Sequence, residues 1–239
     1  MSIVSQSSAT QVRELPRLFK APLVHGIRKG QKTETRQPLK PQPLPGLATT
    51  APGVTMFSWK GGVFYETPDD FLYKLAERCP LGKVGDRLWV KETIYGYLEH
   101  KIGKNPPKNW DSSKTIYDWG TYWYAADELE HPDPVDLDWT VYTSAIHCPR
   151  WAARLILEIT EVRVERLQEI TASDALAEGI SIYEGDRLSL PEEGKVVERM
   201  YLDQFQKLWN GIYAADGYGW DANPFVWVQK FKVLQGGVA

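Results

Sequence analysis

Residues 153–165 read ARLILEITEVRVE, and they form the most regular strand pattern in the chain. Apolar side chains occupy every second position from Leu155 to Ile159, so they share one face of a strand. The apolar positions then change parity at Val162. A change of parity within one strand indicates an extra residue, and the sequence therefore predicts a β-bulge or bend near Thr160-Glu161.

The segments on either side of this strand predict further strands and two helices. Thr171 is a suitable N-cap for a short helix that ends at Gly179. Residues 197–214 have apolar side chains at helical spacing, which predicts an amphipathic helix with a buried stripe. The stripe is Tyr201, Phe205, Leu208 and Ile212, the closing strand is predicted at Phe225–Val233, and an earlier strand is predicted at Arg87–Glu92 after Gly85-Asp86.

The rest of the chain predicts a polar leader and two insertions. The leader covers residues 1–15, and the segment Pro16–Lys29 favours a short helix because Gly30 suits its end. Residues 40–80 begin with a proline-rich stretch that excludes helix and central strand. The predicted elements of this first insertion are two hairpin strands (Thr55–Trp59 and Val63–Glu66) and a helix (Asp69–Glu77), and a second insertion at 96–140 contains one strand (Thr121–Ala125).

This order of elements predicts a single domain of the α+β class over residues 1–239, with a small β-barrel and helices packed outside it. The chain has 43% hydrophobic and 25% charged residues, which is ordinary for a globular protein. Its formal net charge of −3 is unlike that of a strongly basic nucleic-acid binder, so a nucleic-acid contact would need a local basic patch. No apolar run approaches the length of a membrane span, and the expected location is the cytoplasm.

The segment Gly30 to Arg36 is the first candidate for chemistry. Lys32 and Thr35 are three residues apart around a turn, so they can converge on one site. A threonine hydroxyl becomes a nucleophile when a base takes its proton, and a lysine can be that base if its pKa is lowered. Glu178 is a candidate for handling the proton. The alternative is that these charges are a solvated face after a helix.

The stretch from Ile27 to Arg36 resembles the signature of ASCH domains, in which a glycine precedes a lysine and then a threonine, as Gly30, Lys32 and Thr35 do here. Further segments are similar to ASCH-like proteins of phages and prophages. They are Gly85–Glu92, Ile146–Arg154 and Trp220–Val228. The resemblance implies a barrel similar to the PUA domain, with RNA or a modified nucleoside bound in a cleft beside it. A phage-encoded protein of this kind would work in the host cytoplasm.

One branch of the family that this chain resembles is an amidohydrolase that removes the acetyl group from N-acetylated cytidine. By this resemblance Lys32 would be the base, Thr35 the nucleophile and Glu178 the proton-handling acid. That branch has an arginine two residues after the threonine, where this chain has Gln37. Arg36 is one position early, so on a strand its side chain is expected on the opposite face.

A second group of candidate ligand contacts lies around His147 and Trp151. Arg150 and Arg154 could contact phosphate, Trp151 could stack on a base, and His147 could transfer protons near neutral pH. The alternative is a tight turn that docks Trp151 into the core. The full set of predicted ligand contacts is Gly30, Arg36, Trp89, His147, Arg150, Trp151 and Arg154.

The sequence contains no metal or cofactor signature. Cys79, Cys148 and the histidines lack the spacing of a zinc site, and no phosphate-binding glycine loop or dinucleotide fingerprint occurs. We therefore expect no cofactor and no metal. Three hypotheses remain: hydrolysis of an acylated nucleoside, binding of RNA or a modified base without catalysis, and metal-independent RNA cleavage. In the last, Lys32 and Arg36 would stabilise phosphate charge and His147 would move protons.

Overall fold

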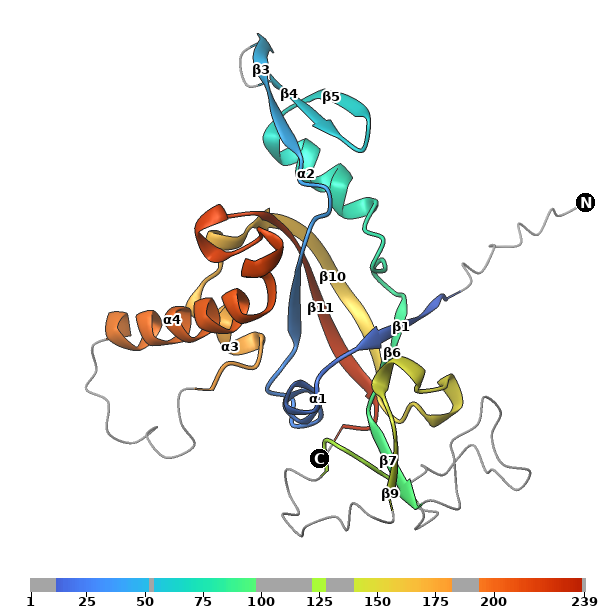
Figure 1. Cartoon of the computed structure of the whole chain (residues 1–239). Helices are drawn as coiled ribbons and strands as arrows, with labels where there is room; N and C mark the ends of the chain where they lie inside the picture. Colours follow the sequence, from blue (N-terminus) through green and yellow to red (C-terminus); the bar gives the residue numbers. More distant parts are fainter. Residues whose placement is uncertain (1–11, 52–53, 98–121, 128–139, 182–193, 238–239) are drawn as a thin grey trace, which may run out of the picture.

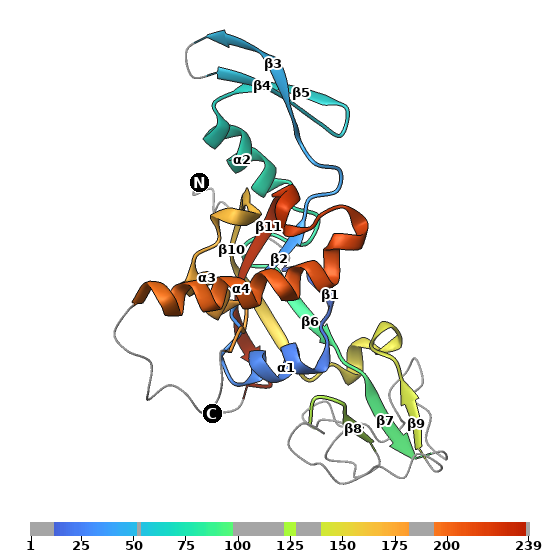
Figure 2. The same cartoon turned by 60° about the vertical axis from the view of Figure 1, so that its left-hand side comes forward.

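The computed structural model describes residues 12–51, 54–97, 122–127, 140–181 and 194–237. A mixed five-stranded sheet forms the centre of the molecule, with helices on its outside (Figures 1 and 2). One edge pair is parallel and the other pairs are antiparallel. The strand order is β1 (Glu14–Leu18), β6 (Arg87–Lys91), β10 (Ile156–Arg166), β11 (Phe225–Gln235) and β2 (Glu34–Pro38).

The two long strands β10 and β11 are the axis of this sheet. Leu157 and Ile159 on β10 are completely buried, as their alternation predicts. The pairing register shifts between Ile159 and Glu161, which confirms the predicted bulge. Beyond the bulge Val164 faces a second apolar cluster, so one strand contributes to two parts of the core.

The sheet confirms the predicted α+β class, but its strands do not close into a barrel among the described residues. β1 and β2 are the two edges of the sheet order, and no ladder joins them. Each edge strand contains a proline, Pro16 or Pro38, which has no N–H to donate to a ladder. Residues of both edge strands nevertheless line one pocket, so the sheet curls until its edges face each other.

The predicted helix over Pro16–Lys29 is wrong in its first part. Residues Glu14–Leu18 form β1, and only α1 (Ala21–Arg28) is helical. Alternate side chains of β1 pack toward the core. Pairing of this segment with β6 makes it a strand. Most of the predicted polar leader, residues 1–11, lies outside the described residues.

The first predicted insertion forms a lobe above the central sheet, as Figure 1 shows. Its three-stranded sheet and helix confirm the predicted hairpin and helix, and Phe57 stacks on Phe71 in its core. The lobe also contains an additional strand in the proline-rich region. Its elements are β3 (Leu44–Ala51), β4 (Val54–Trp59), β5 (Gly62–Glu66) and α2 (Pro68–Glu77).

The second predicted insertion is described only in part. Its strands form a small sheet in the order β8-β7-β9, which continues the chain beyond β6. Residues 98–121 and 128–139 lie outside the described part of the chain. The strands are β7 (Ile94–Tyr97), β8 (Tyr122–Tyr124) and β9 (Thr140–Thr143), followed by the short 3-10 helices η3 (Ala145–His147) and η4 (Arg150–Ala152).

Two α-helices cover the outer face of β11. Thr171 caps the first of them through the backbone N–H of Asp174, as predicted. Phe205 and Trp209 on the second pack against Val226 and Val228. The helices are α3 (Ala172–Ala177) and α4 (Gly194–Tyr213), with η5 (Leu167–Glu169), η6 (Ala214–Asp216) and η7 (Trp220–Ala222) beside them. None of the helices in the described ranges is long and apolar enough to cross a membrane.

The predicted stripe of α4 is correct for two of its four residues and wrong for the other two. Tyr201 is partly buried and packs against the core. Phe205 is buried, but Leu208 and Ile212 are 41% and 44% exposed. The helix turns Trp209 toward the core instead. Leu208 and Ile212 lie outside the core and line the pocket beside the sheet.

The two cysteine thiols should resist alkylation in the folded protein. Both are buried and free, in separate apolar clusters. Burial raises the pKa of the Cys79 thiol, and it raises that of Cys148 to about 11, so few thiolates form at pH 8. Intact mass spectrometry after iodoacetamide treatment should show no adduct on the folded chain and two in urea. Rapid labelling of either thiol without denaturant would contradict this packing.

Candidate functional site

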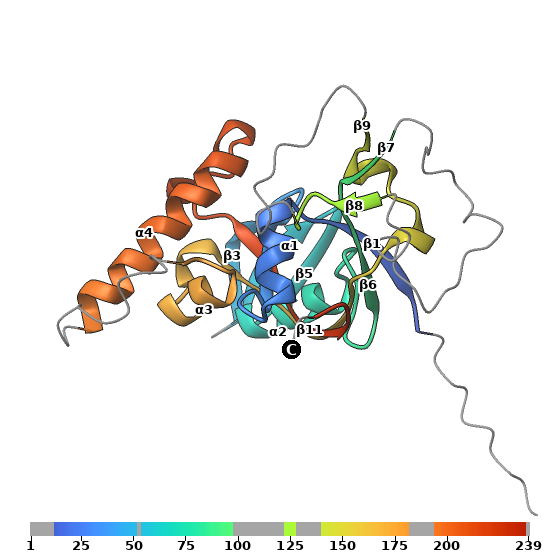
Figure 3. The same ribbon diagram turned by 90° about the horizontal axis from the view of Figure 1, so that it is seen from below.

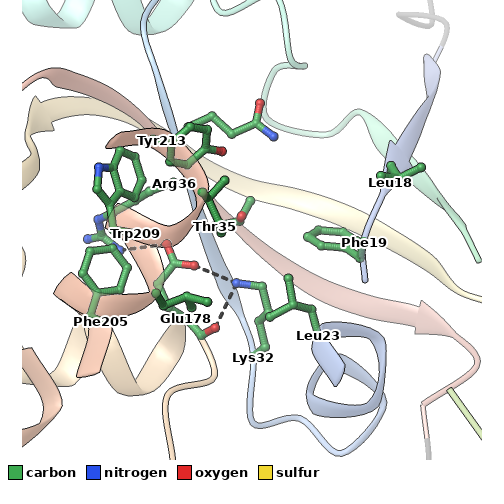
Figure 4. Close-up of a pocket in the computed structure, with 13 residues that line it drawn as sticks. Leu18, Phe19, Leu23, Lys32, Thr35, Arg36, Glu178, Phe205, Trp209 and Tyr213 are labelled. Atoms are coloured by element: carbon green, nitrogen blue, oxygen red, sulfur yellow. Dashed lines mark hydrogen bonds and ion pairs between the residues drawn. The ribbon is translucent and has the colours of Figure 1, made fainter. Parts of the chain in front are cut away.

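A pocket of about 120 Å³ opens between the two edge strands of the central sheet. In Figure 4, Leu18 of β1 and the next residue, Phe19, lie on one side, and Thr35 of β2 lies across from them. Helix α4 covers the pocket from outside. The lining residues are Leu18, Phe19, Leu23, Lys32, Thr35, Arg36, Gln37, Glu178, Phe205, Leu208, Trp209, Ile212 and Tyr213.

Lys32 lies in the pocket wall because the chain turns sharply after α1. Gly30 takes a left-handed conformation (φ 69°) that ends the helix. The backbone N–H of Lys32 then donates to the Gly26 carbonyl. Its side chain is 2% exposed, and its Nζ donates to three oxygens: Glu178 Oε2 at 2.7 Å, the Glu34 carbonyl at 2.7 Å and the Glu178 carbonyl at 3.0 Å. These acceptors satisfy all three N–H groups of an ammonium.

Glu178 reaches the pocket from a distant part of the chain because its backbone bridges that of Lys32. The next residue, Gly179, has a φ of 88°, and a Cβ built on it would lie 3.1 Å from the Cβ of Lys32. A side chain at this position would therefore be strained by the positive φ and would crowd the Lys32 side chain. The Glu178 carboxylate is held on both oxygens, by Lys32 on Oε2 and by Arg36 Nη1 on Oε1 at 3.3 Å.

Thr35 faces the same pocket from the middle of β2 (Figure 4). Its partner across the ladder is Gln229 of β11, so the two side chains lie on one face of the sheet. Gln37 has the same parity and also lines the pocket. Thr35 and Lys32 therefore meet in one cavity, as their spacing predicted.

Arg36 has the opposite parity to Thr35, as expected, but its guanidinium still reaches the site. The side chain passes to the face covered by α3, where four carboxylates lie within ion-pair distance. They are Glu34 at 2.5 Å, Glu165 at 2.8 Å, Glu178 at 3.3 Å and Asp174 at 3.6 Å. Burial lowers the pKa of Arg36, but these charges outweigh it and raise the pKa above the ordinary value.

A second arginine, Arg163 on β10, shares these carboxylates with Arg36. It contacts Glu34 at 3.2 Å, Glu165 at 2.8 Å and Asp174 at 3.7 Å. Glu34 is almost completely buried, and this burial raises its pKa despite both arginines. The network therefore fixes the position of Arg36, and through it that of Glu178.

The mouth of the pocket is apolar. Leu18 on β1 is half-exposed, and Leu208 and Ile212 on α4 face it. Tyr213 places a phenol in the same lining. Burial raises the pKa of this phenol, the Glu178 charge raises it further, and the Arg17 charge opposes them. An apolar rim with polar groups at its base is typical of a site for a small organic ligand.

The structure separates the predicted site residues into two groups. Lys32, Thr35, Arg36 and Glu178 line the pocket together. The remaining candidates lie outside the lining. Gly30 is in the turn after α1, and Trp89 is half-buried on β6. His147 is exposed on η3, and Arg150 pairs with Glu14 at the surface. Trp151 packs against Cys148 and its neighbours, and Arg154 is buried with Glu92 and Asp127.

Sequence reasoning missed the β1 and α4 parts of the pocket. The alternation of Leu15, Arg17 and Phe19 is the signal that identifies β1, and the interpretation of Pro16–Lys29 as one helix obscured it. Leu208 was assigned to the core by its spacing. Among the described residues, no group of three His, Cys, Asp or Glu side chains is arranged to hold a metal ion.

Comparison with known proteins gives little beyond this geometry. No family model matches the sequence, and no curated protein matches it. The chain is similar to a solved structure, protein EF3133 from Enterococcus faecalis V583, which is described by the family model DUF984. The TM-score is 0.38 and the identity 10%, over 95% of this chain and 82% of that chain. A similarity this low carries no argument about fold or function.

Proposed function

We propose that the chain binds a modified nucleoside in the pocket between β1 and β2 and hydrolyses an N-acyl group from its base. The observation that carries this proposal is the contact of Lys32 Nζ with Glu178 Oε2 at 2.7 Å, in a cavity that Thr35 also lines. A hydroxyl, an amine and a carboxylate in one pocket are the groups that acyl transfer requires. The sequence resemblance to ASCH domains supports the same assignment.

The size of the pocket favours a nucleoside over an RNA chain. At about 120 Å³ the pocket is smaller than the roughly 300–1,000 Å³ that is usual for small-molecule sites. That space suits an acyl group or one ring, with the sugar at the mouth. The lining contains two cations, Lys32 and Arg36, and both already contact carboxylates. A phosphate would therefore have to compete with these ion pairs.

The proposed reaction uses Lys32, Thr35 and Glu178 in turn. Glu178 accepts a proton from the Lys32 ammonium, and the free amine takes the hydroxyl proton as Thr35 Oγ attacks the acyl carbonyl carbon. The carbon–nitrogen bond then breaks, and Lys32 protonates the leaving base nitrogen. Water attacks the threonine ester and gives a proton to Lys32. Thr35 Oγ leaves with that proton, the carboxylic acid product gives its own proton to solvent water and leaves as a carboxylate, and Glu178 returns its proton to Lys32.

The second candidate function is binding of a modified base without hydrolysis. The observation that favours it is the complete hydrogen bonding of the Lys32 ammonium, because a base must first lose a proton that three acceptors stabilise. Gln37 also occupies the position at which the amidohydrolase branch has arginine. RNA cleavage has less support, because His147 is exposed on η3 and does not line the pocket with Lys32 and Arg36.

The fold assignment belongs to the same proposal. We take the curled five-stranded sheet as an opened form of the PUA-like barrel that the resemblance implies. In this view the unpaired edges β1 and β2 form the cleft that the ligand enters. The expected cytoplasmic location and phage origin are likewise proposals that rest on the resemblance.

Removal of the Thr35 hydroxyl should abolish hydrolysis but leave binding. Wild-type protein should convert N4-acetylcytidine, or a related acylated nucleoside, into the nucleoside without its acyl group. Thr35→Ala should do so at least about 10³-fold more slowly. Chromatography of the products measures both rates. Thr33→Ala is the matched control, because Thr33 is exposed two residues away. Absence of wild-type turnover on every acylated nucleoside would reject hydrolysis, and calorimetric binding of the same compounds would then support the second candidate.

A further inference from the structure

Tyr213 is the last residue of α4, and it lines the pocket together with Thr35. Its ring packs against that of Trp209 one turn earlier, with 4.4 Å between the ring centroids. The chain turns back directly after it, because the backbone N–H of Tyr218 donates to the Tyr213 carbonyl at 3.1 Å. Ring and backbone are therefore held in place, and the direction of the hydroxyl hydrogen is the main freedom that the phenol keeps.

The Tyr213 hydroxyl has no hydrogen-bond partner in the described part of the chain, yet solvent reaches it. Buried polar atoms are normally paired, and only a few unpaired side-chain N and O atoms of the described residues are sealed from solvent. Neither the Tyr213 hydroxyl nor Thr35 Oγ is among them, although both lack a partner. Both residues line the pocket, so a ligand there can approach both oxygens. The sealed atoms are Arg17 Nε, Arg28 Nε, Glu66 Oε2 and Gln229 Nε2.

The other hydrogen-bond donors of the lining are engaged, with one exception. The Lys32 ammonium has three acceptors, and the Arg36 guanidinium lies among four carboxylates. Trp209 Nε1 donates to a backbone carbonyl at 2.7 Å. The exception is Gln37, whose half-buried amide lies two residues from Thr35 on the same face of β2. Besides the nucleophile itself, the lining thus offers two available donors, this amide and the phenol.

The phenol has the protonation state and the position that an oxyanion donor needs. Burial and the Glu178 charge raise its pKa, so it keeps its proton near neutral pH, while the Arg17 charge lowers the pKa. A cation that favours the phenolate also polarises the O–H bond and strengthens it as a donor. In Figure 4, Tyr213 and Lys32 lie on opposite sides of Thr35. The base can therefore take the hydroxyl proton on one side, and the phenol can meet the carbonyl oxygen on the other.

We propose that the Tyr213 phenol binds the acyl oxygen of the substrate and stabilises it as an oxyanion when Thr35 attacks. The inference rests on the proposed function for the identity of the ligand. As the bond from Thr35 Oγ to the acyl carbon forms, the carbonyl π pair moves onto oxygen, and the phenol donates to this alkoxide without losing its proton. When the carbon–nitrogen bond breaks, the pair returns to form the carbonyl of the threonine ester. The phenol stabilises the charged oxygen more than the neutral one, so the contact acts on kcat.

Tyr213→Phe tests this role because it removes the hydroxyl and keeps the ring against Trp209. On N4-acetylcytidine its kcat should fall about 10²-fold with a small change in KM, and its Tm should equal that of wild type. Tyr201→Phe is the matched control, because Tyr201 lies on the same helix and packs against the core outside the lining. Wild-type kcat in Tyr213→Phe would keep the hydrolase and overturn the role of Tyr213. The same result with a large loss in Gln37→Leu would assign the oxyanion to the amide instead.

Ligand binding tests the contact without turnover. In Thr35→Ala protein, calorimetry compares N4-acetylcytidine with cytidine, which lacks the acyl oxygen. Addition of Tyr213→Phe should weaken binding of the acetylated ligand about three- to tenfold and leave cytidine unchanged. Equal weakening of both ligands, or of neither, would overturn the contact. If wild-type protein has no turnover, selective weakening would keep the contact and reject the hydrolase, whereas absence of N4-acetylcytidine binding would overturn both.

Discussion

Replacement of Lys32 by methionine should lower the hydrolysis rate of an acylated nucleoside by about 10³–10⁴-fold. The variant lacks the amine that takes the Thr35 proton in the proposed reaction, and it also lacks the donor that holds Glu178 Oε2 at 2.7 Å. Methionine has a similar length, so the pocket keeps its shape. Because binding of the base depends on the apolar rim, KM should change much less than kcat.

The control for this prediction is Lys207→Met. Lys207 is exposed on α4, next to the rim residue Leu208. Its replacement by methionine therefore removes a charge near the mouth of the pocket without altering the pocket wall. Its rate should stay within about twofold of wild type, as is usual for surface substitutions. A Lys32→Met protein that is folded and retains wild-type kcat would show that the base is another group, and the assignment of Lys32, Thr35 and Glu178 would fail together.

Replacement of Arg36 by methionine should have the largest effect on stability, about 3–5 kcal/mol near neutral pH. The side chain lies within ion-pair distance of four carboxylates, of which Glu34 and Glu178 are buried. Removal of one partner from a buried ionic cluster leaves negative charges that Arg163 and Lys32 compensate only in part. Urea unfolding monitored by tryptophan fluorescence measures the difference, with Arg199→Met as control because Arg199 is 84% exposed.

The pH dependence of this loss has a definite sign. Burial already raises the pKa of Glu34 in the wild-type protein, and removal of the Arg36 charge should raise it further. A carboxyl group with a higher pKa when folded favours the folded state at low pH, and this stability is lost as pH rises through the folded pKa. The destabilisation by Arg36→Met should therefore shrink as pH falls from 7 toward 5. A loss of equal size at both values would indicate a packing defect instead.

The sequence predicted local features well where neighbouring residues determine them. The bulge after Ile159 follows from a parity change within one strand, and the Thr171 cap follows from side-chain chemistry within one turn. The prediction that Lys32, Thr35 and Glu178 share a pocket also agrees with the geometry, although Glu178 is distant in sequence. That part came from resemblance to a family motif, since spacing along the chain does not reveal a backbone bridge between positions 32 and 178.

Features that depend on tertiary packing were not predicted. Residues at Glu14–Leu18 form a strand because β6 offers a parallel partner, and no local signal in the chain outweighed the apparent helix pattern. Leu208 and Ile212 have the spacing of core residues, but α4 rotates so that Trp209 takes the buried position. The burial of Arg17 likewise depends on which residues surround it, because an arginine is ordinarily a surface residue.

The placement of the two insertions has a consequence for how this scaffold can diversify. Along the sequence, the lobe from β3 to α2 is inserted between β2 and β6. The small β7–β9 sheet is inserted between β6 and β10. Neither interrupts the ladder of β10, β11 and β2 that sets the register of Thr35. Insertions of very different length can therefore be accommodated at these two junctions while the Thr35 side chain keeps its place in the pocket.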